Sequence, residues 1–123
     1  MKVGIFDAKT KEFRAEDISD DLETFYKIID CDAIDIVTRY VNGVQFDIIC
    51  DDEGLLKEKP IVTAVNISFQ PMLVGTLIFA HNDGNGNLTD ITDDDEALLQ
   101  FTTSMMGMIW PCEYFKYEKV DEA

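Results

Sequence analysis

The chain has 123 residues, of which 46% are hydrophobic, and its 25 Asp and Glu against 10 Lys and Arg give a formal net charge of −15. These figures fit one globular domain, which we expect to span residues 1–120, with a frayed acidic tail at residues 121–123. The apolar content excludes a disordered acidic chain. The longest apolar run, residues 72–80, is far shorter than the roughly 20 residues that cross a membrane.

The distribution of charge argues against one class of partner. Residues 60–115 contain no Lys or Arg, whereas a protein that grips phosphate backbones needs clustered basic side chains. We therefore expect no direct binding to nucleic acid or to a membrane surface. The negative charge either keeps the protein soluble or attracts a basic protein partner.

The amino-terminal sequence MKVGIFDAK is too short and too charged for a signal peptide, so we expect a cytoplasmic protein. Cys31, Cys50 and Cys112 are odd in number and form no CxxC pair. In a reducing compartment they are expected to be free thiols.

The first predicted elements are two short strands and a helix. Residues 2–6 predict a strand, and residues 11–15 predict its partner. Asp20, with Glu23 three residues later, resembles a capping box and predicts a helix over residues 20–30. The apolar stripe of this helix is Leu22, Phe25, Tyr26 and Ile29.

Residues 33–41 and 44–50 flank Asn42-Gly43, which is a strong hairpin signal. A two-residue loop would put Arg39 opposite Phe46 and would mix polar and apolar side chains on one face. A three-residue loop, with Gly43 in the left-handed conformation at its end, makes one face apolar apart from Thr38. We therefore predict the three-residue loop. Its cross-strand pairs are Tyr40 with Val44, Ile36 with Ile48 and Ile34 with Cys50.

The middle of the chain is less regular. An acidic turn at residues 51–54 and a connector at 55–60 lead to residues 61–70, whose alternation is too poor to decide between strand and loop. Residues 73–81 are apolar on both faces, which predicts a central strand. Gly75 within it suggests close packing or a bulge.

The last third predicts a turn over residues 81–87 and a second helix. Thr92 is its expected N-cap with Asp95 at the third helical position, and Gly107 is its expected stop. Leu98, Phe101, Thr102 and Met105 share one face and are expected to pack on the core. Residues 112–120 predict an edge strand, and a homodimer through that edge is one alternative.

The predicted order is β(β)αββ…βαβ. It defines an α+β fold in which a mainly antiparallel sheet of about five strands is covered by two helices. The glycines expected at structural turns are Gly43, Gly54, Gly84 and Gly86.

Two acidic segments are candidates for a binding surface. Acids crowd the turn at residues 51–54 and the first turn of the second helix, where the helix dipole also favours them. A DNA mimic would need both segments, with Asp83 and Asp90, on one surface; four consecutive acids on a helix fan out over one turn and cannot copy a row of phosphates alone. The candidate surface residues are Asp51, Asp52, Glu53, Asp93, Asp94, Asp95 and Glu96.

Asp83, Asn85 and Asn87, with Thr89, match the first positions of a calcium loop. Leu88 and Asp94 stand where that loop needs Gly and a bidentate Glu, so a plain turn is favoured and no cofactor or metal is expected.

Catalytic residues are not indicated. His81, the single histidine, could pair with Cys112 only in space, and no local signature supports that pair. The aromatic residues near the carboxyl end fit either the core or an interface. They are Trp110, Tyr114, Phe115 and Tyr117.

Two runs carry a family resemblance: FDIICDDEGLL at residues 46–56, and VGTLIFA at residues 74–80 followed by an Asp-Gly turn and Leu88-Thr89. Together they resemble the family catalogued as domain of unknown function 3846, over roughly residues 1–105. Asp51 stands where that family often has Asn, and residues 60–64 depart from its Pro-Asn/Arg segment. The resemblance implies an accessory protein of phages, plasmids or integrated elements, mostly of Gram-positive bacteria, and brings no catalytic residues.

The sequence thus favours a non-enzymatic accessory protein that binds a protein partner through an acidic surface. A DNA-mimic inhibitor of a nucleic-acid-binding protein is one alternative. The other is a small-ligand binder or enzyme with a pocket between sheet and helices, near Gly75 or residues 51–54.

Overall fold

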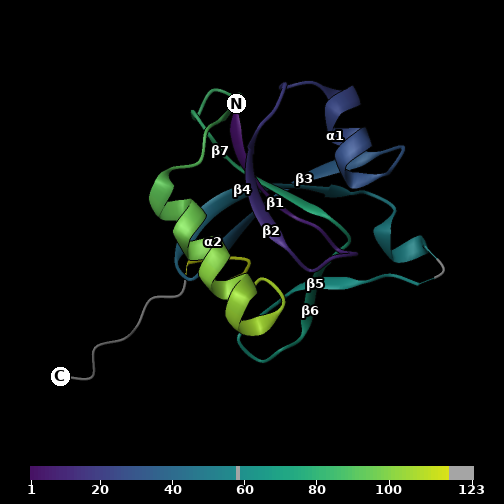
Figure 1. Ribbon diagram of the computed structural model, residues 1–123, viewed down its shortest axis with the longest axis vertical. Helices are drawn as coiled ribbons and strands as arrows, with labels where there is room; N and C mark the ends of the chain where they lie inside the picture. The colour runs from purple at the N-terminus through teal and green to yellow at the C-terminus, as the bar shows by residue number, and fades with distance from the viewer. Residues whose placement is uncertain (58, 117–123) are drawn as a thin grey trace.

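The structure is a computed structural model that describes residues 1–57 and 59–116 (Figure 1). Within these residues the chain forms, in order, β1 (Lys2–Phe6), β2 (Phe13–Asp17), α1 (Leu22–Ile29), β3 (Ile34–Val41), β4 (Val44–Asp51), the 3₁₀ turn η1 (Gly54–Leu56), β5 (Val62–Val65), β6 (Pro71–Val74), β7 (Leu77–Asn82), β8 (Leu88–Thr89), α2 (Asp93–Met106) and β9 (Cys112–Glu113).

One mainly antiparallel sheet has the strand order β2-β1-β7-β4-β3-β9, and β8 extends it beside β7. β5 and β6 form a separate hairpin. A backbone hydrogen bond of 3.0 Å from the Val65 amide to the Ile109 carbonyl joins this hairpin to the segment after α2. The predicted α+β class is confirmed. The strands outnumber the expected five because part of the undecided segment 61–70 forms β5, the run 73–81 is divided between β6 and β7, and β8 is an additional strand of two residues.

The central strands are buried on both faces, with one helix on each face. Alternate residues of β4 and β7 therefore belong to two different apolar clusters. The cluster with Leu99 of α2 includes Phe6, Phe46, Ile48, Leu77 and Phe79. The cluster with Phe25 and Ile29 of α1 includes Val3, Ile5, Ile49 and Ile78. Burial of these side chains on both sides is the main force that holds the sheet between its helices.

The register of the β3–β4 hairpin differs from the prediction. Val41 pairs with Val44, so the loop has two residues, and Arg39 does lie opposite Phe46. Asn42 and Gly43 both have positive φ, at 49° and 84°, as in the type I′ turn that fits the twist of a two-residue hairpin. The prediction was wrong because it assumed one apolar face, whereas the apolar side chains of this hairpin serve both clusters.

Two boundaries near the amino end shift. The strand expected at residues 11–15 pairs with β1 as predicted but spans Phe13–Asp17. The N-cap of α1 is Asp21, whose carboxylate accepts a hydrogen bond of 2.8 Å from the Thr24 amide, so the predicted cap at Asp20 is one residue too early. Asp20 and Asp21 have the same capping chemistry, and only the backbone selects between them.

The apolar run 73–81 is not one strand. Gly75 has φ of +77° and, with Thr76, separates β6 from β7. A left-handed residue here suits glycine and turns the chain between two strands of different sheets. β7 then runs to Asn82, so the turn expected at residues 81–87 begins two residues later.

The second helix begins and ends as predicted, but its core face is different. Thr92 and Asp95 form the capping box, and Gly107 closes the helix in the left-handed conformation. The buried side chains are Asp95, Leu99, Thr102 and Thr103. Phe101 and Met105, expected in the core, are 65% and 68% exposed.

At the carboxyl end, β9 pairs with β3 along Tyr40 and Val41 only. The predicted strand at residues 112–120 is therefore shorter than expected among the described residues, and its part at residues 117–120 lies outside them. The predicted tail at residues 121–123 also lies outside the described part of the chain.

The two-residue turn gives a test of the register. Because Asn42 is left-handed, Asn42→Ala should lower the free energy of unfolding by about 1 kcal/mol, whereas Asn42→Gly should leave it nearly unchanged. Urea unfolding of both variants and of the wild type measures this. Equal stability of the Ala and Gly variants would contradict the turn, because a three-residue loop accepts Ala at this position.

Candidate functional site

The first turn of α2 is built from a capping box and one histidine. The Thr92 hydroxyl accepts a hydrogen bond of 3.1 Å from the Asp95 amide, and the Asp95 carboxylate accepts one of 2.8 Å from the Thr92 amide. The same carboxylate lies 2.6 Å from Nε2 of His81, at the end of β7. Asp95 is buried, so it does not belong to the acidic surface that was predicted for residues 93–96.

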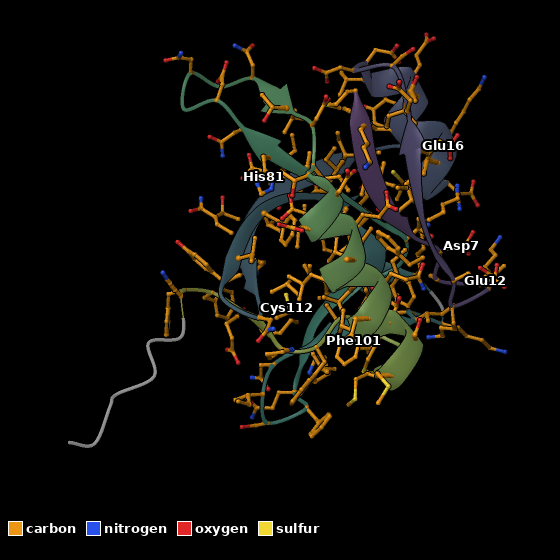
Figure 2. All side chains as sticks on the ribbon, turned by 60° about the vertical axis from the view of Figure 1, so that its left-hand side comes forward. Asp7, Glu12, Glu16, His81, Phe101 and Cys112 are labelled. Atoms are coloured by element: carbon orange, nitrogen blue, oxygen red, sulfur yellow. The ribbon has the colours of Figure 1, made fainter. Side chains whose placement is uncertain are left out.

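His81 links the sheet to this helix. Its ring stacks on Phe46 of β4 at 5.1 Å between centroids, while its Nε2 lies against the Asp95 carboxylate. Cys112, the partner that sequence reasoning considered for His81, lies well apart from it in Figure 2. Burial raises the pKa of the Cys112 thiol to about 12, which is the reverse of what a nucleophile needs. The three cysteines are free thiols, as expected.

Several carboxylates surround the amino terminus and Lys2. The Lys2 ammonium lies 2.7 Å from Asp93 and 3.1 Å from Glu96, and the Lys2 amide donates to Asp90 at 3.0 Å. The terminal amino group lies 2.7 Å from Asp17. Hydrogen bonds to Asp93 and then Glu96 raise the pKa of Lys2. We call this region, formed by Asp17, Asp90, Asp93, Asp94 and Glu96, the acidic end.

The acidic end continues into an exposed apolar stripe on α2. Asp94, Ala97, Phe101 and Met105 follow one another at helical spacing, and all four are exposed. We call these four residues the outer face of α2. Figure 2 shows Phe101 on the part of the helix that follows the turn beside His81. Aromatic side chains and Met are enriched in protein interfaces, so this stripe has the composition of a contact surface.

The other predicted acidic segment, Asp51, Asp52 and Glu53, lies at the opposite end of the sheet. Asp51 is the last residue of β4. Because Ile49 pairs with Ile78, Asp51 lies beside the start of β7. β1 pairs with β7 so that Lys2 falls level with His81, at the far end. Thr76, which lies level with Asp51, and His81 are five residues apart in the chain, a distance on the order of 17 Å. The structure therefore brings Asp93, Asp94 and Glu96 together with Asp17 and Asp90, and does not bring Asp51–Glu53 to them.

The Asp51 carboxylate has partners within the protein. Its side chain is 5% exposed and forms an ion pair of 2.8 Å with Lys57, and it accepts a hydrogen bond of 2.9 Å from the Glu53 amide. Gly54 follows in close contact with Val74, where a Cβ would approach within 2.7 Å. This turn thus has a structural reason for its acid and its glycine.

The calcium-like loop is a hydrogen-bonded turn. The Asp83 carboxylate accepts hydrogen bonds from the amides of Asn85 and Asn87, at 2.7 and 3.2 Å, and from the Asn87 side chain at 2.9 Å. Hydrogen bonds from Asn87 and Asn85 lower the pKa of Asp83. Gly84 and Gly86 adopt positive φ in the same loop. Among the described residues, no group of three or more His, Cys, Asp or Glu is arranged to hold a metal ion.

The aromatic residues near the carboxyl end divide between contact and exposure. Phe69 stacks on Trp110 at 5.7 Å, and the Arg39 guanidinium lies 4.5 Å from the centre of the Tyr114 ring. Tyr114 and Phe115 are exposed. Tyr117 lies outside the described residues.

Sequence reasoning missed the outer face of α2 because it assigned Phe101 and Met105 to the core. A signal was present in the sequence: Asp95, Leu99, Thr102 and Thr103 also recur at helical spacing. Asp95 and the two Thr are polar, and only their hydrogen-bond partners make them suitable for burial. Thr102 bonds to the Trp110 carbonyl at 2.6 Å, and Thr103 to the Leu99 carbonyl at 3.0 Å.

The fold and these surfaces define an α+β protein with a mainly antiparallel sheet and a helix on each face. The chain belongs to the family described as Domain of unknown function (DUF3846), whose model matches residues 1–105. The matched range includes the β4 turn, β7 and most of α2, but not β9. No curated protein and no solved structure matches the chain. No helix in residues 1–57 and 59–116 has the length and apolar character needed to cross a membrane.

Asp95 gives a test of the link between sheet and helix. Burial alone would raise its pKa, but the hydrogen bonds from the Thr92 amide and His81 outweigh burial and hold the pKa below its usual value. Its contribution to stability is therefore present above about pH 4 and is lost as the pH falls through the lowered pKa. Urea midpoints from pH 7 to about pH 2.5 should fall more steeply for the wild type than for Asp95→Asn.

Asp94→Asn is the matched control, because it removes one carboxylate from the same helical turn without touching the capping box or His81. It should keep the acid sensitivity of the wild type. Identical pH profiles for Asp95→Asn and the wild type would contradict the assignment.

Proposed function

We propose that this protein is a non-enzymatic binding domain that docks a basic protein partner on the acidic end and the outer face of α2. The observation that carries the proposal is the exposure of Phe101 and Met105 on a helix whose opposite face is fully packed. Large apolar side chains that the core does not need, beside a rim of charge, mark an interaction surface.

The charge on this surface selects the chemistry of the partner. The first turn of α2 presents Asp93, Asp94 and Glu96, and the helix contains no basic residue. The side chain of Asp93 is 98% exposed. Asp17 and Asp90 add carboxylates from two other segments. A partner with Lys and Arg around an apolar pocket is complementary to this arrangement, and its encounter is steered by the opposite charges.

A general protein partner is favoured over DNA mimicry. Mimicry requires a long array of carboxylates, and the register of β4 and β7 separates Asp51–Glu53 from the acidic end. An exposed Phe in the middle of the array has no counterpart in a row of phosphates. The resemblance noted in the sequence adds the context of this proposal, an accessory protein of a mobile element acting in the cytoplasm.

The test is affinity capture from a lysate of the encoding organism by the wild type and by variants, quantified by mass spectrometry. Phe101→Ala should weaken capture of the partner by about tenfold or more, as expected for a central aromatic contact. Asp93→Asn with Asp94→Asn should weaken it at low salt and have little further effect at high salt.

Two matched controls use the opposite end of the molecule. Leu55→Ala removes an exposed apolar side chain from η1, and Asp52→Asn with Glu53→Gln removes the same number of charges. Both should capture the partner as the wild type does. A partner retained by Phe101→Ala but lost with the η1 or residue 52–53 variants would contradict the proposed surface. Because Phe101 is largely exposed, its variant should unfold at nearly the wild-type urea concentration.

A further inference from the structure

A cleft opens at the end of the sheet opposite the acidic end. It lies between the turn after β1, the last turn of α1, the end of β4 with η1, and the turn between β6 and β7, and its volume is about 510 Å³. Figure 1 shows α1 and the teal turn η1 on the right, away from the first turn of α2. Figure 2 shows Asp7, at the rim of the cleft, on the opposite side of the view from His81.

The walls of this cleft concentrate positive charge. Lys9, Lys27, Lys57 and Lys59 all line it, which is four of the ten Lys and Arg in a chain with a net charge of −15. They come from three separate segments, so the fold and not the local sequence gathers them. We call this site the lysine cleft.

The carboxylates in the lysine cleft are largely satisfied by the protein. Asp51 is paired with Lys57, and Asp7 accepts hydrogen bonds from the amides of Lys9 and Thr10 at 2.8 and 3.1 Å. The third is Asp30, whose backbone amide closes α1 and whose carboxylate has no partner in the described part of the chain. Among the described residues, Lys9, Lys27 and Lys59 form no ion pair. Within the part of the chain that the structure describes, three ammonium groups are therefore available to a ligand.

The remaining wall is apolar and comes from Ile28, Ile29, Pro60 and Ile61. A cleft of this volume is within the range of sites for small organic molecules. A cleft lined by both ammonium groups and aliphatic side chains suits a molecule with a charged group and a flat or apolar body. Lys is a common phosphate ligand because its ammonium is a compact charge with three donors.

We propose that the lysine cleft binds a small phosphorylated organic molecule, with Lys9, Lys27 and Lys59 contacting the phosphate and Ile28 and Ile61 contacting the organic body. The site is separate from the surface proposed for protein binding, and either can fail without the other. At physiological salt the Debye length is about 8 Å, so the carboxylates of the acidic end are screened from a ligand in the cleft.

A purely structural role for these lysines is the rival explanation. Lys27 lies in the last turn of α1, where the helix dipole favours a cation, and Lys57 holds Asp51. Neither role requires Lys9 or Lys59 to face the same cavity. The two explanations differ in one measurable respect. If the lysines form a ligand site, the affinity for a phosphorylated molecule depends on both Lys27 and Lys59; if their roles are structural, it does not.

The test is a titration of the ¹⁵N-labelled full chain with pyrophosphate, AMP, ADP and adenosine at constant ionic strength, followed by amide NMR shifts. AMP or ADP should give saturable shifts at Lys9, Gly54, Gly75 and Thr76, with a Kd of about 1 mM or tighter. Pyrophosphate should bind more weakly than the best nucleotide, because it lacks the organic body. Lys27→Ala with Lys59→Ala should raise the Kd at least about tenfold.

Lys116→Ala is the matched control, since Lys116 is exposed and does not line the cleft. It should leave the Kd unchanged, and circular dichroism should show that all variants are folded. Three outcomes would overturn the proposal: no saturable shift with any phosphate probe, equal shifts with adenosine, or an equal loss of affinity in Lys116→Ala.

Discussion

The pairing of β7 with β1 on one side and β4 on the other is the constraint on which the rest of the structure depends. Phe79 pairs with Gly4 and with Ile48, and its neighbours along β7 are buried on alternate faces. One face then requires the cover of α2 and the other that of α1. The helices are held by these contacts more than by their own propensity, since α1 is too short to be stable alone. Fixing this register also fixes which residues meet at each end of the sheet.

Each end consequently brings together a different set of charged groups. At one end the amino terminus, the end of β7 and the first turn of α2 converge, and they bring several carboxylates around Lys2. At the other end the loop after β1, α1 and η1 converge and gather lysines around a cavity. The ten Lys and Arg are therefore unevenly distributed, because four of them line this cleft beside Asp7, Asp30 and Asp51. The two ends are separated by more than a Debye length at physiological salt, so a partner at one and a ligand at the other would be recognised independently.

Local signals predicted the features that depend on nearby residues. The Thr92–Asp95 capping box, the Gly107 stop and the Asn42-Gly43 turn lie where the sequence indicates, because each involves a few consecutive residues. The hairpin register and the core face of α2 were predicted wrongly, because both depend on burial from two sides and on partners distant in the chain. His81 makes Asp95 suitable for burial, and the Trp110 carbonyl does so for Thr102. The local sequence of the two acidic segments does not show where they lie in the fold. The four lysines of the cleft form no recognisable sequence pattern.

The uneven distribution of the lysines can be measured without knowing any partner or ligand. Amide relaxation enhancements from a cationic and an anionic nitroxide, compared residue by residue, report the electrostatic potential near each amide. The account predicts that the cationic probe is enriched at residues 90–94 and that the anionic probe is enriched at Lys9, Lys59 and Gly75, despite the negative net charge. Uniform exclusion of the anionic probe from both ends of the sheet would contradict it.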